Sequence, residues 1–263
     1  MLPPRIHLPS NGSHHYFPNN TSSNFTVKVS HLFNGKVSDG KIECALSQII
    51  FPNTYRNVRD GLNGVIIYHA SDNESETVEH FQVPPGYYSD IKQLLHTIRH
   101  IAPPLNGISG KPKVSIGYHE LRRKCWVNVS KTFYIEFQFD IARLLGFEPD
   151  IKIKGDTEKK HRVFSTYHAG VHRELSTIFV YCDIIQHQLI AETSAPLLRI
   201  LNWNHTERTQ NISQTFSELF YVPLKAYDFD TIHIYLLDSM GYPISFEEDG
   251  HTYAVLEFRE IDS

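Results

Sequence analysis

The chain has 263 residues, of which 41% are hydrophobic, 12% aromatic and 21% charged. This composition is that of a globular protein, and the slightly low charged content argues against a disordered chain. The formal net charge of −4 argues against a protein that holds a genome by neutralising phosphates, because such proteins carry a basic excess. The length allows one large all-β domain, or one such domain with an insertion.

The three cysteines, Cys44, Cys125 and Cys182, lie far apart and form no CxxC pair. This spacing argues against a disulfide framework and a structural zinc site, so we expect three buried, reduced thiols. Residues 1–10 contain no apolar core and predict no signal peptide. No run of about 18 apolar residues predicts a membrane span. We therefore expect synthesis in the cytosol.

The first two dozen residues are rich in Pro, Asn and Ser, and predict an extended arm. Residues 25–29 then alternate between apolar and polar side chains, which is the period of a half-buried strand. Clusters of Asn, Asp and Gly separate the strand-like segments that follow, at about 42–51, 65–69 and 77–83. We assign residues 1–83 to the N-terminal arm and the first half of a jelly roll.

The period changes after Pro84-Pro85-Gly86. Ser89 stands where an N-cap is expected, and Pro103-Pro104 ends the helix that follows. One apolar face of this helix has the spacing i, i+3, i+4 and i+7, with Ile91, Leu94, Leu95 and Ile98.

Strands are expected next at about 112–117, 123–130 and 132–138. A short second helix follows, with Asp140 as its expected cap and Gly146 at its left-handed end. We assign residues 84–155 to an inserted α/β unit.

The last part of the chain returns to strands, and residues 156–263 are expected to form the second half of the jelly roll. Gly241 suits a left-handed turn position. The strand-like segments lie at about 175–185, 196–203, 212–222, 230–237 and 252–259. The predicted fold class is mainly β, a jelly-roll β-sandwich with a small α/β insertion.

Sixteen histidines raise the question of a metal site. The pairs His14-His15, His96 with His100, and His168 with His172 do not form an HExxH motif or a His-x-His pair. Neither a nucleophile elbow nor a phosphate-binding glycine loop is present. We therefore expect no catalytic, cofactor-binding or metal-binding residues, no cofactor, and a protein that is not an enzyme.

Acidic residues in the strands leave two alternatives. Asp183 is either an acid with a shifted pKa or a side chain that pairs with a neighbouring backbone group or arginine. Asp238 and Glu257 fall at strand ends or turns. The basic run at residues 158–162 is expected to be a solvated loop.

Aromatic and apolar side chains crowd three short segments: residues 216–222, Tyr87-Tyr88, and the trio Tyr16-Phe17-Pro18. If exposed, such clusters are the anchors of an oligomer interface, where Tyr, Phe and Trp are enriched. The alternative, that these side chains simply belong to the core, stays open.

Several segments resemble, in order along almost the whole chain, proteins encoded by Polinton (Maverick) elements. The opening LPSNGS and YFPNNT resemble that family's "LPSNSS…FPxNT", and FDIARLLGF resembles its "LAxlLGF". The other similar segments lie at residues 43–61, 87–98, 180–201 and 220–259. Ile190-Ala191-Glu192 stands where Val-Gly-Asp is usual, so the form of that turn stays open.

This resemblance implies a minor capsid (penton) protein with a jelly-roll core, which forms homopentamers at icosahedral vertices beside a double-jelly-roll major capsid protein. It also implies a virion location, with synthesis in the host cytoplasm and assembly there or in the nucleus. It carries over no catalytic residue, no cofactor and no specific nucleic-acid binding. A ring needs a heterologous interface, in which two different patches of each subunit meet.

Two other functions compete with this one. A jelly roll can be a binding module for a glycan or receptor, with Trp203 and then Trp126 as the candidate stacking residues. An enzyme on the same scaffold is the third hypothesis, and a stoichiometric bound transition metal would make the scattered histidines candidates for a site.

Overall fold

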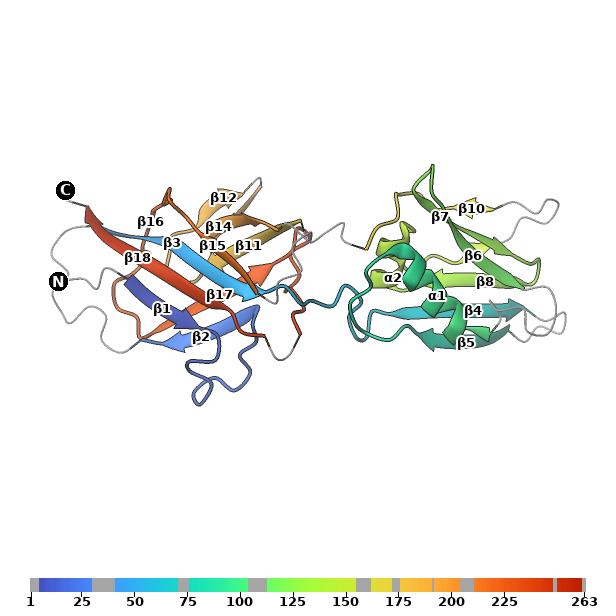
Figure 1. Ribbon diagram of the computed structural model, residues 1–263, viewed down its shortest axis with the longest axis horizontal. Helices are drawn as coiled ribbons and strands as arrows, with labels where there is room; N and C mark the ends of the chain where they lie inside the picture. The colour runs from blue at the N-terminus through green and yellow to red at the C-terminus, as the bar shows by residue number, and fades with distance from the viewer. Residues whose placement is uncertain are drawn as a thin grey trace. The chain divides into compact units, whose positions relative to one another are not determined.

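The structure is a computed structural model that describes residues 5–29, 41–70, 76–103, 113–154, 162–171, 176–190, 192–203, 211–247 and 250–261. It divides the chain into two compact units (Figure 1). We call residues 1–55 and 174–263 the jelly-roll unit and residues 56–173 the inserted unit.

Two antiparallel sheets form the jelly-roll unit. One has the strand order β1-β18-β3-β15, with the short β16 also paired to β3, and the other has the order β14-β11-β17-β2. A small hairpin, β12-β13, lies between β11 and β14 in the sequence. The bounds are β1 Arg5–Pro9, β2 Asn24–Lys28, β3 Lys41–Pro52, β11 Thr177–Cys182, β12 Gln188–Ile190, β13 Thr193–Ala195, β14 Leu197–Asn202, β15 Asn211–Thr215, β16 Val222–Pro223, β17 Thr231–Leu237 and β18 Tyr253–Ile261.

The order of the eight principal strands identifies the fold. Numbered along the chain as β1, β2, β3, β11, β14, β15, β17 and β18, they read 1-8-3-6 in one sheet and 2-7-4-5 in the other. The chain changes sheets at every step except from the fourth strand to the fifth. This arrangement of two sheets and two Greek keys is a jelly roll, so the predicted fold class is confirmed.

Strict alternation places the core between these sheets. In β17 the side chains of Ile232, Ile234 and Leu236 are buried and their neighbours are not. Phe25 and Val27 of β2 are buried in the same cluster, as their spacing predicts. Each such side chain contributes roughly 1.5–3 kcal/mol through burial, and the sheets are held together mainly by this apolar layer.

The inserted unit consists of two antiparallel sheets, β5-β4-β8-β9 and β10-β7-β6, and two helices (Figure 1). Buried side chains from these sheets and helices give the unit a core of its own. Helix α1 spans Ile91–Ile101 and α2 spans Phe139–Leu145. The strands are β4 Gly64–Ala70, β5 Glu76–Gln82, β6 Val114–His119, β7 Lys124–Val129, β8 Phe133–Phe137, β9 Ile153–Lys154 and β10 Val163–Phe164. No helix in the described part of the chain is long and apolar enough to span a membrane.

The insertion is larger than predicted, because its limits are residues 56 and 173 rather than 84 and 155. Strands β4 and β5, expected in the jelly roll, belong to it. Val65 and Ile67 of β4 pair with residues of β8 and are buried in the second core. Alternation predicts a half-buried strand, but it does not identify the sheet that the strand joins.

Both helix starts also differ from the prediction. The N-cap of α1 is Asp90, whose Oδ1 accepts the Gln93 N–H at 2.9 Å, while Ser89 donates to the Gln93 side chain. Asp140 lies inside the first turn of α2, after the N-cap Gln138. The expected apolar face of α1 is buried, and Gly146 has the expected left-handed φ of 81°.

Candidate functional site

The acidic side chains considered in the sequence analysis, Asp183, Asp238 and Glu257, accept hydrogen bonds that stabilise the fold. Asp183 Oδ1 accepts the backbone N–H of His233 at 2.8 Å, so the pairing alternative is confirmed. Asp238 Oδ1 accepts the backbone N–H groups of Met240 and Tyr242 in the turn that Gly241 closes. Glu257 accepts from Arg5 and from the Tyr221 hydroxyl.

The histidine pairs are not brought together with other ligands. His96 and His100 are exposed on α1, and His172 lies outside the described residues. Within the described ranges, no group of three or more His, Cys, Asp or Glu side chains could hold a metal ion. Of the basic run at 158–162, only Arg162 is described, with its guanidinium 4.3 Å from the centre of the Trp126 ring.

The three cysteines are buried, free thiols, as expected. Burial raises the pKa of both Cys125 and Cys182 to about 12. Burial, and after it the nearby Cys182, raises the pKa of Cys44 well above its ordinary value. A thiol with such a pKa is a poor nucleophile at neutral pH, because the thiolate is the reactive form.

Trp203 does not provide the exposed stacking surface that the glycan hypothesis assigned to it. Its side chain is only 4% exposed and packs edge-on against Phe51 and Tyr55. Its Nε1 donates to Asn53 Oδ1 at 3.0 Å. Trp126 is half-buried beneath the Arg162 guanidinium, so neither tryptophan offers a bare ring to a ligand.

The aromatic segments divide between core and surface. Val222 is buried, whereas Phe220 is 57% exposed. The Arg199 guanidinium lies 3.7 Å from the Phe216 ring centre and 4.6 Å from that of Phe220. Tyr88 is buried, whereas Tyr87 and Tyr16 are exposed.

Sequence reasoning missed an apolar surface on the outer face of the sheet β14-β11-β17. The register aligns two rows of side chains across these strands, Ile200-Phe179-Leu237 and Leu197-Tyr181-Tyr235. In β11 and β17 the neighbours along the strand are buried, and in β14 the buried residues are Leu198 and Leu201, so these six side chains point outward. We call them the outer apolar face.

Packing within the outer apolar face is close, and part of it is open. The rings of Tyr181 and Tyr235 stack with centroids 4.9 Å apart and an angle of 6°. Ile200 remains 51% exposed. Outward positions of a sandwich are usually polar. The sequence of β11, TIFVYC, could have indicated this face, because its outward residues are nearly as apolar as its inward ones.

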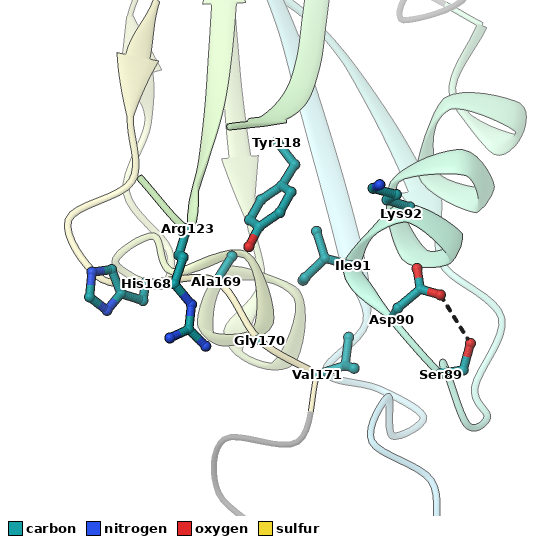
Figure 2. Close-up of a pocket in the computed structure, with 10 residues that line it drawn as sticks. All are labelled: Ser89, Asp90, Ile91, Lys92, Tyr118, Arg123, His168, Ala169, Gly170 and Val171. Atoms are coloured by element: carbon teal, nitrogen blue, oxygen red, sulfur yellow. Dashed lines mark hydrogen bonds between the residues drawn. The ribbon is translucent and has the colours of Figure 1, made fainter. Parts of the chain in front are cut away.

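A hollow of about 760 Å³ lies in the inserted unit (Figure 2). Its walls come from three segments far apart in the sequence, which sequence analysis had no means to bring together. These are residues 89–92 at the start of α1, Tyr118 and Arg123 on either side of the turn between β6 and β7, and residues 168–171. The volume is that of a site for a small ligand, roughly 300–1,000 Å³.

Charged groups of both signs lie around this hollow. The Lys92 ammonium is 2.6 Å from a Glu120 carboxylate oxygen. The pKa of Asp90 is lowered mainly by the hydrogen bond from the Gln93 N–H. Figure 2 shows Arg123 and Asp90 on opposite sides, with the Tyr118 hydroxyl pointing into the space between them.

Comparison with known proteins finds no family that matches the chain, and no curated protein matches it. Among solved structures, the chain is similar to the crystal structure of the selenomethionine-labelled penton protein of mavirus. The two share 12% sequence identity, and the match covers 98% of this chain and 99% of the other, with a TM-score of 0.45. The fold assignment rests on the strand order and not on this similarity.

Proposed function

We propose that this chain is a minor capsid protein of the penton type, which forms homopentamers at the icosahedral vertices of a Polinton/Maverick-type double-stranded DNA element. The resemblance of several segments to proteins of that family supports the proposal. A jelly roll alone does not, because one fold serves many functions. The observation that carries the proposal is the outer apolar face.

The outer apolar face has the composition of an interface. Its six side chains are apolar or aromatic, and five of them are Phe, Tyr or Leu. Burial raises the pKa of both Tyr181 and Tyr235 above the ordinary value, so both rings stay neutral over the physiological pH range. A neighbouring subunit can therefore cover this face without burying a charge, which would be costly.

A closed ring needs two different patches on each subunit, and the outer apolar face is proposed as one of them. Besides the neighbouring subunits of the ring, the double-jelly-roll major capsid protein is proposed as a partner. The location that follows is the capsid vertex of a virion. The net charge of −4 favours a role in the shell over specific contact with nucleic acid.

Size-exclusion chromatography with light scattering tests the proposal. The wild-type chain of 30.4 kDa is expected to give five copies, about 152 kDa, after concentration. The double variant Phe179→Asp with Leu237→Asp is expected to give one copy, because a carboxylate cannot be buried unpaired. Thr231→Asp, on the same face of β17 but outside the two apolar rows, is the matched control and is expected to remain pentameric.

Far-UV circular dichroism of the three proteins separates loss of assembly from loss of fold. A wild-type chain that stays monomeric at high concentration, with no affinity for the major capsid protein, would contradict the proposal. The same holds if the double variant assembles like the wild type.

A further inference from the structure

The hollow of the inserted unit is built on a fixed frame. Arg123 has a left-handed φ of 51°. Its backbone N–H donates to the Glu120 carbonyl at 3.1 Å, and its own carbonyl accepts the Ala169 N–H at 2.8 Å. These bonds tie the β6-β7 hairpin to the segment 168–171, so two of the three walls are held together by backbone hydrogen bonds.

Two polar groups that line this hollow form no hydrogen bond with the described residues: the Arg123 guanidinium and the Tyr118 hydroxyl. Tyr118 does interact electrostatically with Lys92, whose pKa is raised mainly by the hydrogen bond to Glu120 and in smaller part by Tyr118. The Tyr118 ring is half-buried and packs against the core of the inserted unit, which fixes the direction of its hydroxyl. A preformed donor costs little ordering entropy when a ligand arrives.

An acceptor, Asp90, lies on the side of the hollow across from these donors, with its carboxylate turned toward Ser89 (Figure 2). The Asp90 carboxylate accepts the N–H of Gln93 at one oxygen. The Ser89 hydroxyl, which donates to the nearer Gln93 side chain, lies 3.3 Å from the other oxygen. Lone pairs remain for a ligand, since a carboxylate has about four. The Asp90 side chain already caps the N-terminus of α1. The attraction of a ligand to this hollow therefore does not depend on the helix N-terminus. Ile91, Ala169 and Val171 add an apolar floor.

This combination discriminates between ligand classes. Lys92 also lines the hollow but is paired with Glu120. A strongly anionic ligand would therefore meet the Asp90 carboxylate, and a cation would meet Arg123. A neutral sugar has hydroxyl groups that donate to the carboxylate and accept from the guanidinium and phenol, and an apolar ring face that suits an aromatic wall. We propose that the hollow formed by Tyr118, Arg123 and Asp90 binds a neutral pyranose unit of a glycan.

The proposed sugar site goes beyond the capsid role and does not depend on it. It replaces the two tryptophans of the sequence-based glycan hypothesis with residues of the inserted unit. The full chain can be tested on a printed array of neutral and sialylated oligosaccharides, with its oligomeric state measured separately on the same samples.

Three variants leave the backbone undisturbed. Arg123→Gly removes the guanidinium at a φ that glycine adopts freely, Tyr118→Phe removes only the hydroxyl, and Asp90→Asn keeps a capping side chain. Lys152→Ala is the matched control. Lys152 directly precedes β9 of the other sheet of the same unit, and its ammonium lies 3.7 Å from the Tyr68 ring centre. Circular dichroism checks that all four are folded.

We expect the wild type and Lys152→Ala to bind the same neutral oligosaccharides, and each of the three site variants to lose about tenfold in affinity. Three outcomes would overturn the proposal. The first is that the wild type binds nothing on the array. The second is that it binds sialylated oligosaccharides alone, and that Asp90→Asn binds them more tightly. The third is that all three site variants still bind neutral oligosaccharides as the wild type does.

Discussion

At the scale of single residues, the ion pair of Arg59 and Asp140 shows what the inserted unit depends on. The Asp140 side chain is 5% exposed and accepts three hydrogen bonds from Arg59, from the backbone N–H, Nε and Nη2. This carboxylate ties the start of α2 to the loop before β4. Sequence reasoning treated Asp140 as a helix cap, because an acid near a helix start predicts a cap but not a partner 81 positions away.

We predict that Asp140→Ala lowers the free energy of unfolding by about 3 kcal/mol, because it leaves a partly buried guanidinium without its anion. Arg5→Ala is the control. It breaks the pair with Glu257, in which the Arg5 side chain is 64% exposed, and is expected to cost about 0–1 kcal/mol. Denaturant unfolding measures both. Equal losses would show that burial does not govern the Arg59 pair.

The cap of α1 gives a prediction with a pH dependence. Asp90→Ala is expected to destabilise the inserted unit by about 1 kcal/mol at neutral pH, and Ser89→Ala by less. The hydrogen bond from the Gln93 N–H lowers the pKa of Asp90 in the folded chain. The contribution of this carboxylate is therefore present above the ordinary Asp pKa of about 3.9. It is lost as the pH falls through the lower folded value.

Asp90→Asn keeps a capping side chain but removes this titration. Urea midpoints at pH 7 and pH 3 should therefore differ less for Asp90→Asn than for the wild type. The prediction fails if Ser89→Ala proves as costly as Asp90→Ala, since Ser89 would then be the true cap.

The cysteines predict a reactivity pattern. With pKa values of about 12 for Cys125 and Cys182, and a strongly raised pKa for Cys44, all three are protonated and shielded at pH 8. A disulfide reagent such as Ellman's is expected to label none of them in the folded protein and all three in guanidinium chloride. Rapid labelling of even one native thiol would contradict the packing of these residues.

At the scale of helices and strands, the periodicity of the sequence predicts those features that depend on residues close together in the chain. The apolar face of α1 and the left-handed Gly146 followed from spacing alone, because each depends on residues within one or two turns. The sheet that β4 joins did not follow, since pairing with β8 spans some seventy residues and alternation carries no label for the partner. The burial of Trp203 was missed for the same reason, because its partners Phe51 and Tyr55 are remote in sequence.

The separate cores make a prediction about the inserted unit. All buried residues of its cluster come from residues 56–173, and none of the jelly-roll cluster does. A fragment of residues 56–173 is therefore expected to unfold in one cooperative transition, with the circular dichroism of a mixed α/β protein. A fragment without a cooperative transition would show that the two clusters depend on each other for stability.

At the scale of the whole molecule, the chain combines a jelly roll with an inserted unit that has its own core. The outer apolar face of the first is proposed to assemble the ring, and the hollow of the second to bind a sugar. The sequence resemblance suggested assembly but named no contact surface, because outward apolar residues within a strand look like core residues until the register is known.

Electron microscopy of the purified protein at high concentration is the decisive experiment for the proposed ring. We expect rings with fivefold symmetry in the wild type, and no rings in the variant with Phe179→Asp and Leu237→Asp. Single subunits only, or closed assemblies of another symmetry, would contradict it.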